Sequence, residues 1–394
     1  MSPSLRIAAF GFRSIPLREG CAGADTFAAE LLPRLAARGH QVLAYNRLYP
    51  GESGRDGLWQ GVQLRHVKVP WRTRGFDTLW HSARCTWDII AHNRADIVHM
   101  QNGGNSPFAL LLRLAGKRVY LSQDGVDWQR AKWPWHARAY LWMSQWLTAF
   151  APHAVIFDNV FVRAVFENRF GRRYDFIPFG ADLDQHTLDL SILDELGLVP
   201  GGYFLFVGRF IPDKGLQYLI PAFEGLQTDK RLVLVGGSPN PSDFEQRCRS
   251  TQDPRILFPG YVYGARARAL MRHAYAYVQP SDIEGLSPVI LQNMGLGTPV
   301  ICSDIRENRY VVDDCALTFA RGDINDLRET LRRALDAPRD LRTLGARGRE
   351  RVARLFSWDA VAQAHEAAFA DLKAWRNLQA ASTGQVETSL QGGR

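Results

Sequence analysis

The sequence predicts an α/β protein with two doubly wound domains, each a parallel sheet with helices on both faces. The length of 394 residues allows two sizeable cores, and 46% apolar with 22% charged residues is typical of a globular protein. Short apolar strand candidates alternate with segments of helical spacing, which indicates parallel sheets. The alternation restarts after residue 175, so we expect one domain in each half of the chain.

The first series of strand candidates begins near the N-terminus. "RIAAFGF" (6–12) precedes "ADTFAAELLPRLAARGH" (24–40), which has helical spacing and closes with Gly39 as a C-cap. The further strand candidates of this half are "QVLAYN" (41–46), "ADIVHM" (95–100), "RVYLSQ" (118–123) and "HAVIFD" (153–158). We expect them to form a domain of residues 1–175.

The second series occupies the other half of the chain, and we expect a second domain of residues 176–356. From Ser357 the sequence "SWDAVAQAHEAAFADLKAWRNLQ" predicts one C-terminal helix over 357–380. The polar residues 381–394 predict a disordered tail. The strand candidates of the second domain are "YFLFVGR" (203–209), "RLVLVGG" (231–237), "RILFPG" (255–260), "YAYVQP" (275–280) and "TPVICS" (298–303).

Composition argues against several classes of protein. The five cysteines are scattered, with no C-x-x-C pair and no His/Cys cluster at metal-ligand spacing, so we expect a reducing compartment and no bound metal. Neither half carries G-x-G-x-x-G followed by an acid at the right distance, so we expect no bound dinucleotide or other cofactor. The N-terminus lacks the apolar run of a signal peptide and no stretch approaches a bilayer span, which predicts a cytoplasmic protein.

Positive charge and tryptophan both gather in the first half. Residues 1–172 contain 22 Lys and Arg against 12 Asp and Glu, whereas residues 173–394 contain 26 against 28. Nine of the eleven tryptophans precede residue 150, interleaved with arginines around 71–94 and 128–146. Such segments suit an anionic interface, either a lipid surface or a polyanion. The alternative is that these tryptophans pack the first domain and the arginines form its solvated face.

Two loops of the second half follow strands and precede helices, the position at which open parallel sheets bind ligands. In "VGRFIPDKGLQYL" (207–219) the strand ends at Gly208, and Arg209 and Lys214 precede a helix that opens near Gly215. Two cations beside free helix amides predict an anion site suited to a diphosphate. Alternatively, both are ordinary exposed loop charges.

The second loop lies in "SDIEGLSPVILQNMGLGTPVICSD" (281–304). Ser287 can cap a helix that has Pro288 at its first position, which places Glu284 at the mouth of the helix. Glu284 can accept hydrogen bonds from sugar hydroxyls, while the amides of Gly285, Leu286 and Ser287 lie near phosphate oxygens. Gln292, in the second turn, can point to the same place. The alternative is that Glu284 only complements the helix dipole.

These segments resemble a known family. The stretches "VGRFIPDKGLQYLIPAF", "LVLVGG", "ILFPGYV", "AYVQPSDIEGLSPVILQNMGLGTPVICSDIREN" and "IPFGAD" look like the retaining glycosyltransferases of family 4. That resemblance implies the GT-B fold, in which two Rossmann-like domains face a cleft, the first binding acceptor and the second nucleotide sugar. "GFRSIPLREGCAGADTFAAELLPRLAARGHQV" and "QDGVDWQRAKW" resemble the subgroup of bacterial rhamnosyltransferases of surface-polysaccharide assembly.

The resemblance implies roles for the residues of the second half. The reaction would move a sugar, rhamnose in the subgroup, from a nucleotide sugar to a glycan or polyprenyl-diphosphate-linked acceptor without a metal. Arg209 and Lys214 would hold the donor diphosphate and stabilise it as it leaves, and Glu284 would contact the donor sugar. Gln292 stands where the family usually has a second acid that binds the ribose, and an amide can still hydrogen-bond a hydroxyl.

The resemblance also implies roles in the first half. Gly23, in "REGCAGADTF" (18–27), matches the glycine-rich turn that lets the backbone approach the phosphates. Asp124 stands where many relatives carry a histidine near the donor sugar, and it is a candidate for contact with sugar or acceptor. His99 and Asn102 are acceptor candidates, although His99 could equally be a packed core histidine.

Two other functions compete with sugar transfer. A sugar-nucleotide epimerase of similar fold should lack the spaced Arg209/Lys214 and E-G-L-S-P patterns. Gln292, in place of the usual acid, leaves open a non-catalytic nucleotide-sugar or carbohydrate binder. The expected partners of a transferase are a nucleotide sugar, a glycan or lipid-linked acceptor and an anionic membrane surface, and no nucleic acid. We therefore expect a cytoplasmic protein that is peripheral on the inner face of the membrane.

Overall fold

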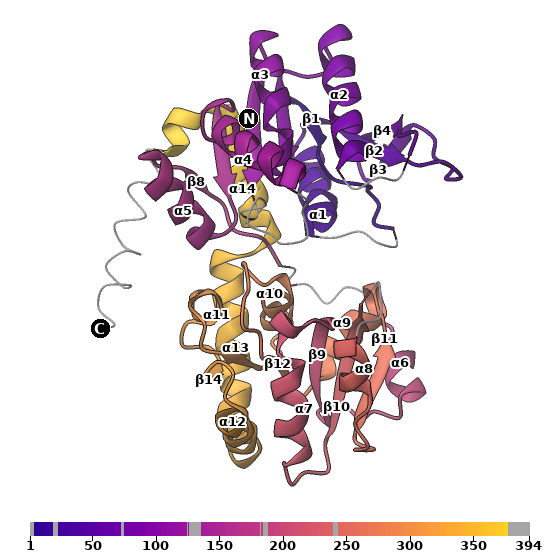
Figure 1. Ribbon diagram of the computed structural model, residues 1–394, viewed down its shortest axis with the longest axis vertical. Coiled ribbons are helices and arrows are strands. Elements are labelled where there is room, and N and C mark those ends of the chain that lie inside the picture. Colours follow the sequence, from indigo (N-terminus) through magenta and orange to yellow (C-terminus); the bar gives the residue numbers. More distant parts are fainter. Residues whose placement is uncertain are drawn as a thin grey trace. The chain divides into compact units, whose positions relative to one another are not determined.

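The computed structural model describes residues 4–18, 23–71, 75–123, 125, 135–181, 183, 188–238 and 243–376 (Figure 1). The chain forms two compact units, unit 1 from Met1–Phe179 with Trp358–Arg394 and unit 2 from Gly180–Ser357. Each unit contains one sheet, and in both sheets the strands are parallel apart from one edge strand of unit 1. The predicted α/β class with two parallel-sheet domains is confirmed.

The sheet of unit 1 has the strand order β3-β4-β2-β1-β5-β6-β7-β8. Its two series of strands diverge between β1 and β5, which pair in parallel with Ile7 opposite Ile97. The edge strand β3 is antiparallel to β4. The strands are β1 (Arg6–Phe10), β2 (Gln41–Leu48), β3 (Gly57–Trp59), β4 (Val62–Lys68), β5 (Ile97–Gln101), β6 (Arg118–Gln123), β7 (Ala154–Phe157) and β8 (Asp175–Phe176).

Helices pack on both faces of this sheet because successive residues of its central strands point to opposite sides. On one side, Val98 and Met100 of β5 join a core with Ile89 and Leu112. On the other side, Phe27 packs against aromatic rings of the C-terminal helix. The helices of unit 1 are α1 (Gly23–Ala37), α2 (Phe76–Ala91), the 3-10 turn η1 (Gly103–Asn105), α3 (Ser106–Leu114), α4 (Trp135–Phe150), α5 (Val160–Phe170) and α14 (Trp358–Ala370).

The C-terminal helix differs from the single helix predicted over 357–380. α14 ends at Ala370, and a second helical segment begins after Asp371. The Asp371 carboxylate accepts hydrogen bonds from the amides of Lys373 and Ala374, both at 3.0 Å, and so caps the new segment. His365 and Phe369 of α14 pack against the rings of His99 and Tyr120 in the first sheet, so α14 is part of unit 1. Residues 377–394, which include the predicted tail, lie outside the described residues.

The sheet of unit 2 has the order β11-β10-β9-β12-β13-β14, and all its strands are parallel. Consecutive strands run outward from β9 in one direction and from β12 in the other. The point at which the strand order reverses therefore lies between β9 and β12, and the carboxyl ends of such a pair are the preferred ligand position. The strands are β9 (Tyr203–Arg209), β10 (Arg231–Gly237), β11 (Ile256–Gly260), β12 (Ala276–Gln279), β13 (Val300–Ser303) and β14 (Leu317–Phe319).

The core of unit 2 is formed by phenylalanines of β9 and apolar residues of the helices beside it. Phe204 and Phe206 pack with Leu216, Leu219 and other buried residues. The helices are α6 (Ser191–Glu195), the 3-10 turn η3 (Pro212–Lys214), α7 (Leu216–Glu224), α8 (Asp243–Arg249), α9 (Gly264–His273), α10 (Pro288–Gly295), α11 (Arg306–Val312), α12 (Ile324–Asp336) and α13 (Pro338–Leu355).

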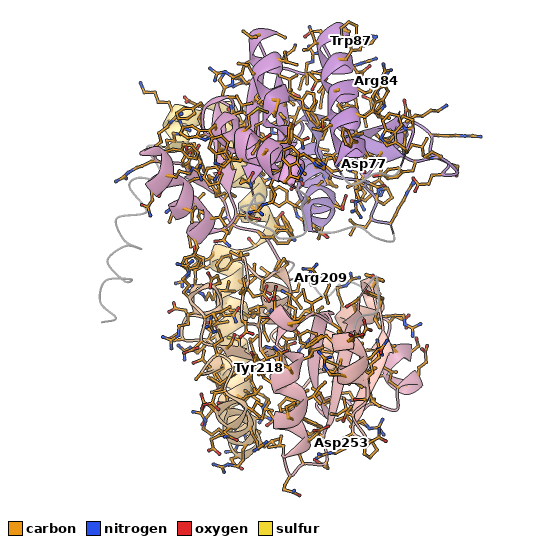
Figure 2. The ribbon with its side chains drawn as sticks, in the orientation of Figure 1. Asp77, Arg84, Trp87, Arg209, Tyr218 and Asp253 are labelled. Atoms are coloured by element: carbon orange, nitrogen blue, oxygen red, sulfur yellow. The ribbon has the colours of Figure 1, made fainter. Side chains whose placement is uncertain are left out.

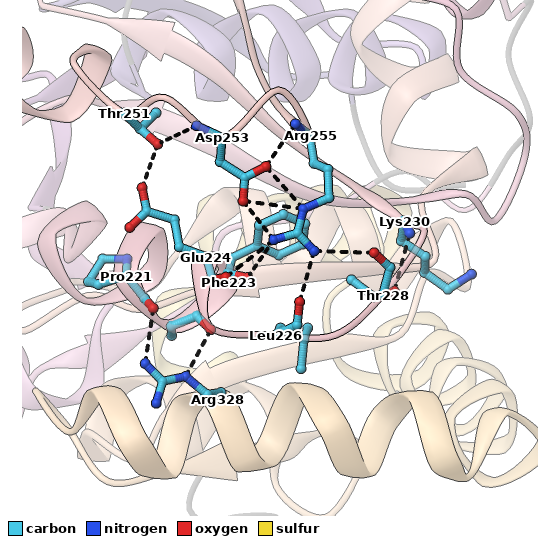
Figure 3. A network of polar contacts seen from close by, with 11 residues as sticks. Pro221, Phe223, Glu224, Leu226, Thr228, Lys230, Thr251, Asp253, Arg255 and Arg328 are labelled. Atoms are coloured by element: carbon cyan, nitrogen blue, oxygen red, sulfur yellow. Dashed lines mark hydrogen bonds and ion pairs between the residues drawn. The ribbon is translucent and has the colours of Figure 1, made fainter.

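Arg209 and Asp253 lie at opposite ends of unit 2 (Figure 2). At the Asp253 end, Arg255 donates to both Asp253 carboxylate oxygens and to backbone carbonyls that include those of Leu226 and Thr228 (Figure 3). Arg328 of α12 donates to the carbonyls of the last turn of α7. This network supplies side-chain donors to carbonyls in the last turn of α7 and in the loop that follows it. It supports the sheet at the end away from the candidate site.

Candidate functional site

The first site loop follows β9. Phe206 and Phe210 are buried on either side of Gly208 and Arg209, which leaves the Arg209 side chain exposed. Gly236 of the neighbouring strand has φ +127°, and a Cβ atom there would overlap the Gly208 carbonyl oxygen. The two strand ends therefore pack backbone against backbone. In the described part of the chain, the Arg209 guanidinium makes no hydrogen bond or ion pair and can contact an external anion.

Gly215 fixes the position of Lys214. It has φ +76° and stands between η3 and α7. A Cβ atom at Gly215 would overlap the carbonyl oxygen of Pro280, so only glycine allows the loop after β9 to approach the end of β12 this closely. The amide of Asp282 donates to the Asp213 carbonyl at 3.0 Å and joins the same two loops. Lys214 is thereby placed beside the loop that carries Glu284.

Lys214 and Glu284 form a bidentate ion pair. The Lys214 Nζ lies 2.6 Å from Glu284 Oε1 and 2.7 Å from Oε2. The two side chains are 19% and 7% exposed, so the pair is partly shielded from water. The structure therefore brings together the two residues predicted for the diphosphate and for the donor sugar.

Two further side chains donate to Glu284 and a third orients one of them, and sequence reasoning missed all three. Ser281 Oγ donates to Glu284 Oε1 at 2.6 Å, and Gln279 Nε2 donates to the same oxygen. The Tyr277 hydroxyl donates to Gln279 Oε1, which leaves the amide NH2 facing the carboxylate. Burial and the charge of Glu284 hold the pKa of Tyr277 well above its usual value, so the hydroxyl stays a donor. The signal was present in "YAYVQP", where Tyr277 and Gln279 share one face of the strand.

The helix that follows Glu284 begins as predicted. Ser287 Oγ accepts from the amide of Ile290 at 3.4 Å and Pro288 is the first residue of α10, so the predicted N-cap is confirmed. Gly285 is exposed and Leu286 is half-buried just before the cap. Gln292 is half-buried in the second turn, and its side chain makes no hydrogen bond within the described part of the protein. Its amide can therefore pair with a ligand hydroxyl.

The arrangement in unit 2 suits an anionic ligand that also carries hydroxyl groups. Arg209 and Lys214 supply positive charge from the loop after β9, and Glu284 supplies an acceptor from the loop after β12. Among the described residues, no group of histidine, cysteine and acidic side chains could hold a metal ion. Within the same residues, no helix is both long enough and apolar enough to cross a membrane.

Family models match both halves of the chain. A model described as "Glycosyltransferase Family 4" matches residues 22–185, and one described as "Glycosyl transferases group 1" matches residues 201–337. Matches in both halves identify the chain as a glycosyltransferase. The second match includes the β9 loop with Arg209 and Lys214 and the β12 loop with Glu284.

Individual relatives of this glycosyltransferase agree with that assignment. The O-antigen chain mannosyltransferase B of Escherichia coli is 30% identical over 178 residues, which are 43% of this chain and 46% of that protein. Most of the curated relatives are matched over about half of their length or less.

Solved structures share its fold. The sucrose-phosphate synthase of Thermosynechococcus elongatus superposes with a TM-score of 0.77 and 23% identity over 95% of this chain and 99% of that one. HepE of Anabaena, solved in complex with UDP and glucose, gives a TM-score of 0.72 and 15% identity over 91% and 97%. These matches confirm the predicted GT-B fold of the glycosyltransferase.

The acceptor candidates in unit 1 of the glycosyltransferase lie in different surroundings. His99 is 1% exposed, and its ring packs against His365 and Phe369 while Nε2 lies 2.8 Å from Ser122 Oγ. Burial holds the pKa of His99 well below its usual value, so the ring is neutral. In this structure it is a packed core histidine, the alternative that the sequence left open.

Asn102 and Gly23 are at strand and helix ends. Asn102 follows β5, has φ 69°, and donates from Nδ2 to the Gly11 carbonyl at 3.0 Å, where the strand order of the first sheet reverses. Gly23 is the first residue of α1, and a Cβ atom there would have no neighbour within 4 Å. Asp124 lies outside the described residues.

Proposed function

We propose that this glycosyltransferase moves a sugar from a nucleotide-sugar donor to a glycan acceptor with retention of anomeric configuration. The observation that carries the proposal is the Lys214–Glu284 pair at the carboxyl ends of β9 and β12, where Arg209 is the last residue of β9. This is where an open parallel sheet binds its ligand, and the residue types suit a diphosphate joined to a hydroxyl-rich sugar.

In the proposed reaction the acceptor hydroxyl oxygen bonds to the anomeric carbon, and the bond from that carbon to the diphosphate oxygen breaks. The electron pair leaves with the nucleoside diphosphate, and the hydroxyl proton passes to the departing phosphate oxygen on the same face of the sugar. Arg209 and Lys214 stabilise the charge that develops on the diphosphate. Glu284 accepts hydrogen bonds from the sugar hydroxyls and fixes the position of the anomeric carbon.

Glu284 is suited to this role because its carboxylate is already held by Ser281 and Gln279. A sugar that binds there meets an acceptor group whose orientation does not have to be fixed during the reaction. Gln292 is proposed to contact the nucleotide ribose through its amide. Gly285, Leu286 and Ser287 are proposed to face the donor phosphates at the start of α10, and Gly208 to leave room beside them.

For the substrates, we propose rhamnose as the donor sugar and a glycan on polyprenyl diphosphate as the acceptor, in the assembly of a surface polysaccharide. The sequence resemblance described above supports both. The Escherichia coli relative is named a mannosyltransferase, so mannose is the second donor sugar to test. An acceptor carried on a lipid would bring the protein to an anionic membrane surface on the cytoplasmic side.

A donor panel tests this function. UDP-, GDP-, ADP- and dTDP-linked sugars are screened by thermal shift, and those that stabilise the protein are incubated with it alone and with candidate acceptors. Slow hydrolysis of one donor, faster with an acceptor, supports transfer. Stabilisation without any hydrolysis or transfer would identify a binder, and release of an altered nucleotide sugar would identify an epimerase.

A further inference from the structure

We propose that the outer faces of α2, α3 and α4 in unit 1 form a docking surface for an anionic lipid bilayer. The inference concerns the outside of unit 1 and does not rest on the transfer reaction in unit 2. Three observations support it: the direction in which the helices present their aromatic residues, their position beside one another, and their charge.

α4 presents most of its large aromatic side chains outward, although Leu147 packs against the core and the rings of Trp146 and Phe150 also contact Phe170 of α5. Its buried residues are Ser144, Gln145, Thr148 and Ala149. Trp135, which is 81% exposed, lies on the opposite stripe at spacings of 7, 11 and 15 residues from three other exposed aromatic residues. The exposed large side chains of α4 are Trp135, Trp142, Met143, Trp146 and Phe150.

α2 also presents tryptophan outward. It buries Cys85 and Ile89 in the core together with His81, Ser82 and Thr86, whereas Trp87 is 66% exposed. Trp87 and Arg84 lie toward one end of α2 (Figure 2). The Trp80 ring is 5.8 Å from that of Trp71, which precedes the helix. The exposed large apolar residues of this segment are Trp71, Phe76, Trp80, Trp87 and Ile90.

α3 joins the two tryptophan-bearing helices into one surface. It packs against both α2 and α4, and the helices cover the same face of the sheet (Figure 1). Its outward residues Leu110, Leu111 and Leu114 are exposed. Elsewhere in the described chain, exposed large apolar side chains are scattered between elements, as in an ordinary monomer. These three helices therefore form the apolar surface that needs a partner.

Charge identifies the partner as an anionic bilayer. α3 and α4 contain no acidic residue, and the two acids of α2 are held internally, Asp77 by Tyr49 at 2.7 Å and Asp88 by Tyr45 at 2.8 Å. The exposed cations on these helices are Arg84, Arg113 and Arg138. Tryptophan beside arginine is the combination found at the headgroup level of membranes. A second copy of this surface would instead bring like charges together.

The test uses the full chain and vesicles of equal parts phosphatidylcholine and phosphatidylglycerol, with pure phosphatidylcholine as the comparison. Binding is measured by sedimentation at low and high salt, and by quenching of tryptophan with brominated lipid. All eleven tryptophans belong to unit 1, so the quenching reports on that unit alone. We expect binding to the anionic vesicles that weakens with salt and that blue-shifts and quenches tryptophan emission.

Matched variants distinguish docking through this surface from non-specific binding to vesicles. The triple variant Trp87→Ser, Trp135→Ser, Trp142→Ser should bind at least about tenfold more weakly, because interfacial binding scales with the apolar area inserted. Its control changes two exposed aromatic residues of unit 2, Tyr261→Ser and Tyr263→Ser, and should bind like the parent.

Two charge-reversal variants, one on this surface and one on unit 2, complete the test. Arg84→Glu with Arg138→Glu should weaken binding at least about tenfold at low salt, because each cation near an anionic surface contributes to binding. The same charge change at two exposed arginines of unit 2, Arg339→Glu with Arg354→Glu, should have a much smaller effect. Light scattering measures the oligomeric state of every variant.

Three results would overturn the proposal. The parent could stay in the supernatant with anionic vesicles at low salt. The surface variants could bind as tightly as their unit 2 controls. Finally, the parent could be a dimer that the triple tryptophan variant converts to a monomer, in which case a second copy covers this surface and not a bilayer.

Discussion

Lys214 Nζ lies within 2.7 Å of both carboxylate oxygens of Glu284, although the two residues are 70 positions apart in the chain. The pair joins the loop after β9 to the loop after β12, the strands between which the order of the sheet reverses. In the proposed reaction, a donor replaces this contact between two side chains with contacts to its phosphate and its sugar hydroxyls. Substitutions around the pair can therefore separate donor binding, turnover and stability.

Gln292 is predicted to affect donor binding more than turnover. If its amide meets a ribose hydroxyl, Gln292→Leu leaves that hydroxyl without a partner and should raise the donor KM about tenfold. Gln292→Glu should be tolerated because a carboxylate also accepts from a hydroxyl. Steady-state kinetics with varied donor measure both. Equal kinetics for Gln292→Leu and the parent would remove this residue from the site.

Gly23→Ala is predicted to leave the folded structure intact while testing the proposed contact with the phosphates. A Cβ atom at this position has no neighbour within 4 Å, and alanine favours the helix that begins there. Gly23→Ala should therefore keep the parent's Tm but raise the donor KM if the backbone approaches the phosphates. Gly57→Ala, in the edge strand β3, is a matched control. An unchanged KM for Gly23→Ala would show that no ligand needs glycine here.

Gln279 is predicted to position Glu284. Gln279→Leu removes one donor from the carboxylate and should lower kcat about tenfold with little change in KM, because the sugar would still bind but in less well-fixed geometry. Tyr277→Phe should produce a smaller effect of the same kind, since the Gln279 amide then loses the contact that orients it. A fall in Tm without any change in kcat would assign both residues a structural role only.

Asp253 is predicted to stabilise unit 2 in a pH-dependent way. Its hydrogen bonds to the Arg255 guanidinium lower the pKa of Asp253 below its ordinary value. The stability it contributes is present above the ordinary pKa of about 4 and is lost as the pH falls through the lower folded-state value. Asp253→Asn should reduce the free energy of unfolding by about 1–2 kcal/mol at pH 7, and by less in acid.

Calorimetry of unfolding is the measurement for Asp253, because unit 2 contains no tryptophan. Glu329→Gln serves as the control, since its partner Arg332 and Glu329 itself are both exposed and such pairs contribute little. A difference between parent and Asp253→Asn that stays constant from pH 7 down to acid would contradict the assignment.

The central strands of both sheets could be predicted from the sequence, whereas strands toward the edge of the first sheet could not. The apolar runs of β1, β5, β9 and β12 are buried strands and were identifiable, whereas β4 has alternating polar residues in "VQLRHVK" and was missed. The break at Asp371 had a local signal, because aspartate is a preferred helix cap. The helical spacing of apolar residues on both sides of Asp371 nevertheless led to the prediction of one continuous helix.

Within the candidate site, the sequence allowed the functional residues of the two loops to be predicted, but not the contacts between them. Pairing of β9 with β12 depends on contacts between residues far apart in sequence, so the ion pair of Lys214 with Glu284 could not be predicted from local pattern. The same limit applies to the tryptophans of α2 and α4. Their spacing fits either a core or a surface, and only packing decides which side faces the sheet.

Turnover of Arg209→Ala tests the central claim most directly. Arg209 is exposed and makes no hydrogen bond or ion pair in the described chain, so its removal should leave Tm unchanged. Lys214→Ala leaves the Glu284 carboxylate without a cation beside it and should also lower Tm, which Lys214→Ala with Glu284→Gln partly restores. The exposed Arg339→Ala is the control for Arg209.

If Arg209 holds the leaving diphosphate, its loss should remove about 2–4 kcal/mol of transition-state stabilisation, a fall in turnover of about two orders of magnitude. Initial rates of transfer are measured with the donor selected by the thermal-shift panel, at saturating acceptor. The account predicts this fall for Arg209→Ala at the parent's Tm, with Arg339→Ala unchanged. Near-parent turnover in both Arg209→Ala and Lys214→Ala would contradict it.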